Sequence, residues 1–84
     1  MYFVYILQSQ KHNRYYVGSC KNVADRLKRH NTGRNKSTKT GIPWDLIHRE
    51  RFITRQEAYK RELQIKSYKG GNSFKKLVNN GEVA

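Results

Sequence analysis

Two short tyrosine-containing segments near the start of the chain could contribute to one reactive site. They read Phe3-Val4-Tyr5 and Tyr16-Val17-Gly18, and ten residues separate the two tyrosines. Each segment lies in a strand-like run, and the turn-forming sequence Lys11-His12-Asn13-Arg14 lies between the runs. A hairpin of two such strands would bring both tyrosines onto one small sheet. With an arginine and a carboxylate nearby, the pair could form the site of a metal-assisted phosphodiesterase. The ordinary alternative is that both rings pack in the core.

Glu62 is the carboxylate whose sequence setting is most informative. A helix that places residues 100° apart puts it near the middle of an apolar arc. The side chains that share or extend this arc are Ala58, Tyr59, Leu63 and Ile65. Burying an unpaired carboxylate costs on the order of 2–7 kcal/mol. Glu62 therefore needs a cation, a metal ion or a position at the rim of the core. An ion pair with Lys66, four residues along the helix, is the alternative that requires no function.

Arg26 and His30 lie one turn apart on an earlier predicted helix. Arg26 is at the edge of the apolar stripe of this helix, where its guanidinium could bind a phosphate through two parallel hydrogen bonds. Because Lys28 and Arg29 lie beside it, a solvated basic face is the alternative. His30 could be a general base or a phosphate contact, whereas a partly buried, hydrogen-bonded histidine is the commoner outcome.

The charge of the chain indicates a polyanionic partner. Eighteen Lys and Arg against six Asp and Glu give a formal net charge of +12, which opposes compaction by self-repulsion. We expect Arg34, Lys36 and Lys39, in the loop from Asn31 to Pro43, to contact nucleic acid. We expect the same of Gly18, where a missing Cβ permits close backbone approach. An anionic membrane surface is the weaker alternative, because no stretch approaches the roughly 20 apolar residues needed to span a bilayer.

The elements that must position these residues can be read from apolar patterns and capping signals. We predict strands over Tyr2–Gln8, Arg14–Ser19 and Trp44–Phe52, and helices over Val23–Asn31, from the Thr54 cap to about Tyr68, and briefly after Ser73. Three strands and two main helices predict one sheet with helices on its faces. The 84 residues allow one domain, with a core over about 2–78 and a frayed tail over 79–84.

Several chemistries and locations are disfavoured by composition. Cys20 is the only cysteine, so the chain can form neither an intramolecular disulfide nor a cysteine-based zinc cluster. The three histidines lack metal-ligand spacing. A thiol enzyme based on Cys20 is a minor alternative. Residues 1–7 resemble a strand more than a signal peptide, and we expect a cytoplasmic protein.

Taken together, these residues resemble the GIY-YIG nuclease family, especially small stand-alone members related to the excision-repair nuclease domain. Phe3-Val4-Tyr5 stands at the first family motif and Tyr16-Val17-Gly18 at the second. Arg26 and Glu62 stand at the positions of the family's arginine and glutamate. The resemblance implies an α+β fold in which a small three-stranded antiparallel sheet is flanked by helices.

The resemblance also implies an endonuclease that hydrolyses DNA phosphodiester bonds with Mg²⁺ (or Mn²⁺), in DNA repair or recombination. Glu62 would hold the metal, Arg26 would neutralise the phosphate, and His30 would assist. Tyr16 would activate the attacking water, and Tyr5 would orient the water or the phosphate. Because tyrosine is a poor base at its usual pKa near 10, a nearby cation would have to lower that pKa.

Two departures from the family pattern support a different function. Ser19 stands where larger members often place a lysine, and Asn72 matches a later asparagine only loosely. The alternatives are a basic nucleic-acid-binding module that cuts poorly or not at all, and an RNA-associated accessory protein. All of these predict salt-sensitive binding, so only metal-dependent cleavage separates them. The sequence predicts neither the preferred substrate structure nor the oligomeric state.

Overall fold

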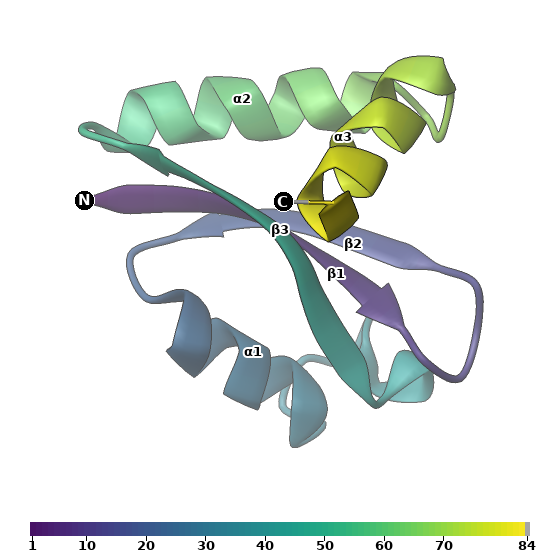
Figure 1. Ribbon diagram of the computed structural model, residues 1–84. Helices are drawn as coiled ribbons and strands as arrows, with labels where there is room; N and C mark the ends of the chain where they lie inside the picture. Colours follow the sequence, from purple (N-terminus) through teal and green to yellow (C-terminus); the bar gives the residue numbers. More distant parts are fainter. Residues whose placement is uncertain (84) are drawn as a thin grey trace.

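The computed structural model describes residues 1–83 and contains one three-stranded antiparallel sheet. Its strands are β1 (Tyr2–Ser9), β2 (Tyr15–Cys20) and β3 (Trp44–Phe52), in the order β2-β1-β3 (Figure 1). Three α-helices accompany the sheet: α1 (Val23–Asn31), α2 (Arg55–Ser67) and α3 (Asn72–Val83). The predicted α+β class and antiparallel sheet are therefore confirmed.

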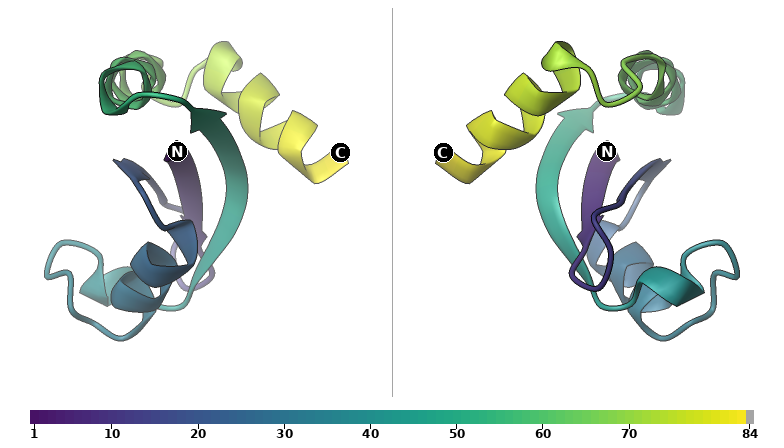
Figure 2. Two further views of the ribbon diagram at one scale, coloured as in Figure 1. Left: turned by 90° about the vertical axis from the view of Figure 1, so that its left-hand side faces the viewer. Right: turned by 90° about the vertical axis from the view of Figure 1, so that its right-hand side faces the viewer.

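The central strand β1 divides the core into two parts. Because successive side chains point to opposite faces, Val4 and Ile6 pack toward α2 and α3, whereas Tyr5 and Leu7 pack on the α1 side. All four are at most 1% exposed, as the uninterrupted apolar run predicts. Figures 1 and 2 show that α2 and α3 lie on one side of the sheet. Helix α1 and the loop that follows it lie on the other side.

Two capping arrangements start the main helices at the predicted residues. The Asn22 side chain accepts a hydrogen bond from the backbone N–H of Asp25 at 3.0 Å, which begins α1. Thr54 and Glu57 form a reciprocal capping box at the start of α2. These local hydrogen bonds fix where each helix begins, and hence which side chains each helix presents to the sheet.

The structure differs from the sequence-based expectation at the end of the chain. The last helix was expected to be short, but α3 continues to Val83; the frayed tail over 79–84 stays a prediction. No proline follows Val78, so nothing in the sequence blocks further backbone hydrogen bonds. Residue 84 lies outside the described residues.

The loop after α1 contains a short 3-10 helix, η1 (Lys39–Gly41), that the sequence pattern did not predict. The loop is tied to the start of β3. The Asn31 side chain exchanges two hydrogen bonds with the backbone of Trp44, and the Trp44 indole N–H donates to the Thr38 carbonyl at 2.8 Å. Within residues 1–83, no helix has the length and apolar character needed to cross a membrane.

Candidate active site

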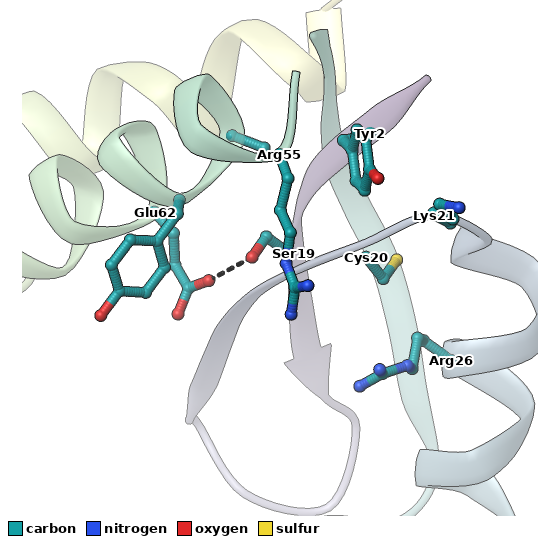
Figure 3. A pocket seen from close by; sticks show the side chains of 9 residues that line it. Tyr2, Ser19, Cys20, Lys21, Arg26, Arg55 and Glu62 are labelled. Atoms are coloured by element: carbon teal, nitrogen blue, oxygen red, sulfur yellow. Dashed lines mark hydrogen bonds between the residues drawn. The ribbon is translucent and has the colours of Figure 1, made fainter. Parts of the chain in front are cut away.

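A hollow with a volume of about 540 Å³ lies where β2, α1 and α2 meet. We call it the central hollow; it is lined by Tyr2, Ser19, Cys20, Lys21, Arg26, Arg55, Ala58, Tyr59 and Glu62. Arg26 from α1 and Arg55 from α2 both point into it, and the Glu62 carboxylate lies at its side (Figure 3). The structure thus brings together the arginine and the carboxylate that the sequence singled out.

Glu62 is held in place by two hydrogen bonds. Glu62 is 9% exposed and lies with Ala58 and Ile65 on the buried face of α2. The Ser19 hydroxyl donates to Oε1 and the Lys66 ammonium donates to Oε2, each at 2.6 Å. The ion pair with Lys66 proposed as an alternative is therefore present, and Glu62 also lines the hollow.

The donor chemistry of Glu62 fits a divalent cation. An ionised carboxylate offers about four lone-pair sites, and two of these are used here. Among residues 1–83, no three His, Cys, Asp or Glu side chains gather around a common point. Glu62 would therefore be the one carboxylate ligand, and water and phosphate oxygens would complete the shell, which is a coordination that Mg²⁺ accepts.

The two guanidinium groups of the central hollow are available to an anion. In the described part of the chain, neither Arg26 nor Arg55 forms an ion pair with a carboxylate, whereas Arg29 and Arg61 do. Lys21 adds a third positive charge to the lining. With only Glu62 to balance these charges, the hollow is positive and suits a phosphate group.

Tyr5 and His30 form a buried hydrogen-bonded chain behind β2. The Tyr5 hydroxyl lies 3.3 Å from His30 Nε2, and His30 Nδ1 lies 2.7 Å from Thr38 Oγ1. The Thr38 hydroxyl donates to the Asn35 carbonyl, so it must accept from His30. We therefore assign the proton to His30 Nδ1 and a donated hydrogen bond from Tyr5 to Nε2.

The ionisation of these groups follows from their burial. Burial, then the neighbouring Tyr16 and Cys20, raise the pKa of Tyr5 far above its usual value, and the lowering effect of Arg26 does not offset them. Tyr5 therefore stays protonated. Burial and Arg26 lower the pKa of His30, which favours neutral imidazole. Burial raises the pKa of the Cys20 thiol, which disfavours a thiol enzyme.

Gly18 makes room for the tyrosine pair. A Cβ added to Gly18 would lie 2.7 Å from the Tyr5 hydroxyl oxygen and 3.1 Å from Tyr16 Cε2. The groups that approach the Gly18 backbone closely are thus the Tyr5 and Tyr16 side chains, on the α1 side of the sheet. The Tyr16 ring is partly buried, 4.6 Å from the His30 ring and 6.2 Å from the Tyr5 ring between centroids.

The four residues expected on one concave surface are only partly brought together. Arg26 and Glu62 line the central hollow, whereas Tyr5 and Tyr16 do not. Tyr5 packs on the α1 side beneath Gly18, while Glu62 reaches the next β2 residue, Ser19, from α2. The tyrosines and the carboxylate therefore approach one segment of β2 from opposite faces of the sheet.

A second, smaller hollow of about 340 Å³ adjoins the first at Arg26. We call it the loop hollow; it is lined by Arg26, Arg29, His30, Arg34, Asn35 and Lys36. Of the residues expected to contact nucleic acid, Arg34 and Lys36 line this hollow. Gly18 does not, and Lys39 lies outside it in η1. The two hollows form a positive region that continues from α2 past α1 to the loop.

Ser19, Arg55 and Tyr59 belong to the central hollow and were missed as site residues by the sequence reasoning. Arg55, Tyr59 and Glu62 are spaced i, i+4, i+7, which places them on one side of a helix, and this spacing could have identified them. Alternation along β2 puts Ser19 on the face opposite Gly18, toward α2. The signals are weak alone, since such spacings are frequent in any amphipathic helix or strand.

Comparison with known proteins relates the whole fold to one family. The model of the GIY-YIG catalytic domain matches residues 1–75. UPF0213 protein SERP0126 of Staphylococcus epidermidis is 40% identical over 68 residues, covering 80% of this chain and 82% of that protein. UPF0213 protein SH2523 of Staphylococcus haemolyticus is 36% identical over 77 residues, covering 90% and 93%. The solution NMR structure of UPF0213 protein BH0048 from Bacillus halodurans matches with a TM-score of 0.58 and 28% identity, covering 94% of this chain and 84% of that one.

Proposed function

The chain belongs to the GIY-YIG catalytic domain family, and we propose that it is a divalent-metal-dependent endonuclease that hydrolyses phosphodiester bonds in DNA. One observation carries this proposal: a nearly buried carboxylate, Glu62, lines the same positive hollow as the guanidinium of Arg26, which forms no ion pair with a carboxylate of the described residues. Hydrolysis of a phosphodiester builds negative charge on the phosphoryl oxygens, and such a hollow can bind and stabilise that charge.

Glu62 is the residue proposed to hold the metal ion, Mg²⁺ or Mn²⁺. When bound, a divalent cation polarises the phosphoryl oxygens and stabilises the leaving oxygen. Each oxygen of Glu62 accepts one hydrogen bond in the structure and keeps further lone pairs. The hydrogen bond from Ser19 fixes the orientation of the carboxylate, as neighbouring groups do in metal sites generally.

Arg26 is proposed to bind the scissile phosphate with its guanidinium fork and to stabilise the transition state. Tyr16 is the proposed proton acceptor for the attacking water. Its ring is only partly buried, whereas the raised pKa of the Tyr5 hydroxyl keeps that group protonated. Tyr5 and neutral His30 would then act as positioning residues, because their rings pack against Tyr16.

The loop hollow is proposed to bind phosphates on one side of the cleavage point. Arg34 and Lys36 lie there beside Arg26, so a strand held by Arg26 can continue onto the loop. Lys39 and Gly18, which do not line the loop hollow, stay predicted contacts of the nucleic acid. DNA is the proposed partner and RNA the alternative, in a cytoplasmic role in DNA repair or recombination.

A specific observation favours the second candidate function, a nucleic-acid-binding module that cuts poorly. Both oxygens of Glu62 already accept a hydrogen bond, one of them from a cation, Lys66. If Lys66 permanently replaces the metal, the hollow binds phosphate but does not assist hydrolysis. The nuclease and the binding module would then share the same site structure, and they would differ only in whether the bound strand is cleaved.

The test is incubation with supercoiled plasmid, branched DNA and RNA, with Mg²⁺, with Mn²⁺ and with a chelator. The proposed function predicts nicking that requires the metal. Salt-sensitive binding without cleavage of any substrate would reject the nuclease and support the binding module. Cleavage of RNA alone would replace DNA by RNA as the substrate.

A further inference from the structure

Tyr59 is a large aromatic side chain that the fold leaves exposed beside the central hollow. It is 54% exposed, although the sequence pattern placed it on the apolar arc of α2. The buried stripe of α2 is instead Ala58, Glu62 and Ile65, and Tyr59 and Leu63 lie beyond its edge. The apolar arc of α2 is therefore wider than its buried stripe, because the sheet covers only the narrow stripe.

The Tyr59 side chain borders open space in two places. It lines the central hollow, and it also lines a depression of about 460 Å³ together with Thr54, Arg55 and Gln56. Arg55 lines both, one helical turn before Tyr59. An exposed aromatic ring is therefore the neighbour, on one helix face at the mouth of the proposed active site, of a guanidinium that forms no ion pair within the described part of the chain.

This pair offers the two contacts that a single nucleotide needs. A base stacks on an exposed aromatic ring, and a guanidinium binds the phosphate of the same strand. In a duplex the faces of each base are covered by its neighbours, so a ring on the protein surface can stack only on a base that has left the helix or was never paired. The combination therefore selects for unpaired nucleotides.

We propose that Tyr59 and Arg55 form a subsite for an unpaired nucleotide, in which Tyr59 stacks on the base and Arg55 binds the phosphate. The preferred substrate then carries a single-stranded segment or end next to the cleavage point. This inference rests on the proposed function, because it names the substrate class of the same site. The positive lining of the central hollow suits the phosphates of a nucleic acid strand.

The experiment measures binding by fluorescence anisotropy in the presence of a chelator, so that cleavage plays no part. The three probes are a short oligothymidine, an abasic oligonucleotide with the same backbone, and a duplex of the same length. The wild type should prefer the oligothymidine over the abasic strand by roughly 5- to 150-fold for one stacked base. Tyr59→Ala should lose this preference, and Tyr59→Phe should keep it.

Two further variants separate stacking from charge and from general surface effects. Arg55→Ala should weaken both single strands alike and reduce the slope of log affinity against log salt by about 0.7. Leu63→Ala is the matched control, because Leu63 is 48% exposed on the next turn of α2 and lines none of the hollows described above. It should bind all three probes like the wild type.

The proposal is overturned if Tyr59→Ala keeps the wild-type ratio between oligothymidine and abasic strand. It is also overturned if Tyr59→Ala loses affinity for all three probes equally while its melting temperature shows that it is folded. Because the chelator prevents metal-dependent cleavage, this binding result does not depend on whether the protein is a nuclease. A protein that never cleaves can still discriminate the two single strands, and a nuclease that cleaves duplex DNA can fail to do so.

Discussion

Replacing Glu62 by Gln tests whether this carboxylate is a metal ligand or only a partner of Lys66. Glutamine keeps the size of the side chain and can still accept the hydrogen bond from Ser19, but it removes the charge. Loss of an outer-shell partner of a metal typically costs about 10- to 100-fold in activity, and Glu62 would be a direct ligand. We therefore expect Glu62→Gln to lower metal-dependent cleavage by more than about 100-fold, which is about 2.7 kcal/mol in the barrier.

The effect of the same change on stability should be much smaller. An i, i+4 ion pair contributes about 0.2–0.5 kcal/mol, and Lys66 is half-exposed in this one. The Ser19 hydrogen bond loses its charged acceptor, which costs about 1 kcal/mol at most. A total near 1 kcal/mol corresponds to a fall in Tm of about 4–8 °C in a domain of this size. It changes the folded-to-unfolded ratio about fivefold, so unfolding cannot imitate the loss of a ligand.

The assay compares initial rates of plasmid nicking across a series of Mg²⁺ concentrations, with Tm measured on the same samples. Glu57→Gln is the matched control, because it makes the same chemical change on the same helix, at an exposed residue of the capping box. Glutamine also serves in a capping box, so this variant should fold and cleave like the wild type.

Three outcomes would refute parts of this reasoning. Full activity of Glu62→Gln would show that the carboxylate is structural. An equal loss of activity in Glu57→Gln would show that charge on α2, and not a ligand, is what matters. A wild type that binds DNA but never cleaves it would favour the binding-module alternative.

Three further predictions concern the groups around Glu62. Gly18→Ala should destabilise the fold by about 1–3 kcal/mol, since its Cβ would overlap the buried Tyr5 ring; an unchanged calorimetric Tm would contradict this. Arg26→Lys should lower cleavage on the order of 100-fold with little change in the salt dependence of binding, because charge remains and the guanidinium fork is lost; equal rates would show that charge alone suffices. Burial and Arg26 lower the pKa of His30, so the unfolded chain takes up a proton more readily. The free energy of unfolding should therefore fall as pH drops below about 6.5. Urea denaturation should show a shallower fall in His30→Gln, and an identical profile would remove His30 as the cause.

The features that the sequence predicted depend on residues close together in the chain. Asn22 and the Thr54–Glu57 pair begin α1 and α2 through hydrogen bonds that span three residues. The uninterrupted apolar run through β1 predicts a strand buried on both faces, and the structure has one. The 100° period placed Glu62 on the buried side of α2. Such patterns work because backbone geometry repeats over a few residues whatever the rest of the fold does.

The width of the buried stripe of α2 and the ionisation of buried groups could not be predicted in this way. Tyr59 belongs to the apolar arc of α2 and yet is exposed, because the width of the covered stripe depends on the sheet and not on α2 itself. The raised pKa of Tyr5 has no local signal in the sequence, because it arises when the packing of α1 and β2 removes its hydroxyl from water.

The active site as a set of contacts exists only in the tertiary structure. Ser19 donates to Glu62 across 43 positions of sequence, and Tyr5 meets His30 across 25. Arg26 and Arg55 belong to different helices that share no local signal, yet both point into the central hollow. Residue types and spacing determined which side chains were chemically able to take part. Which of them meet was decided by the packing of α1 and α2 around the edge strand β2, since distant segments come together only when the core they share is buried.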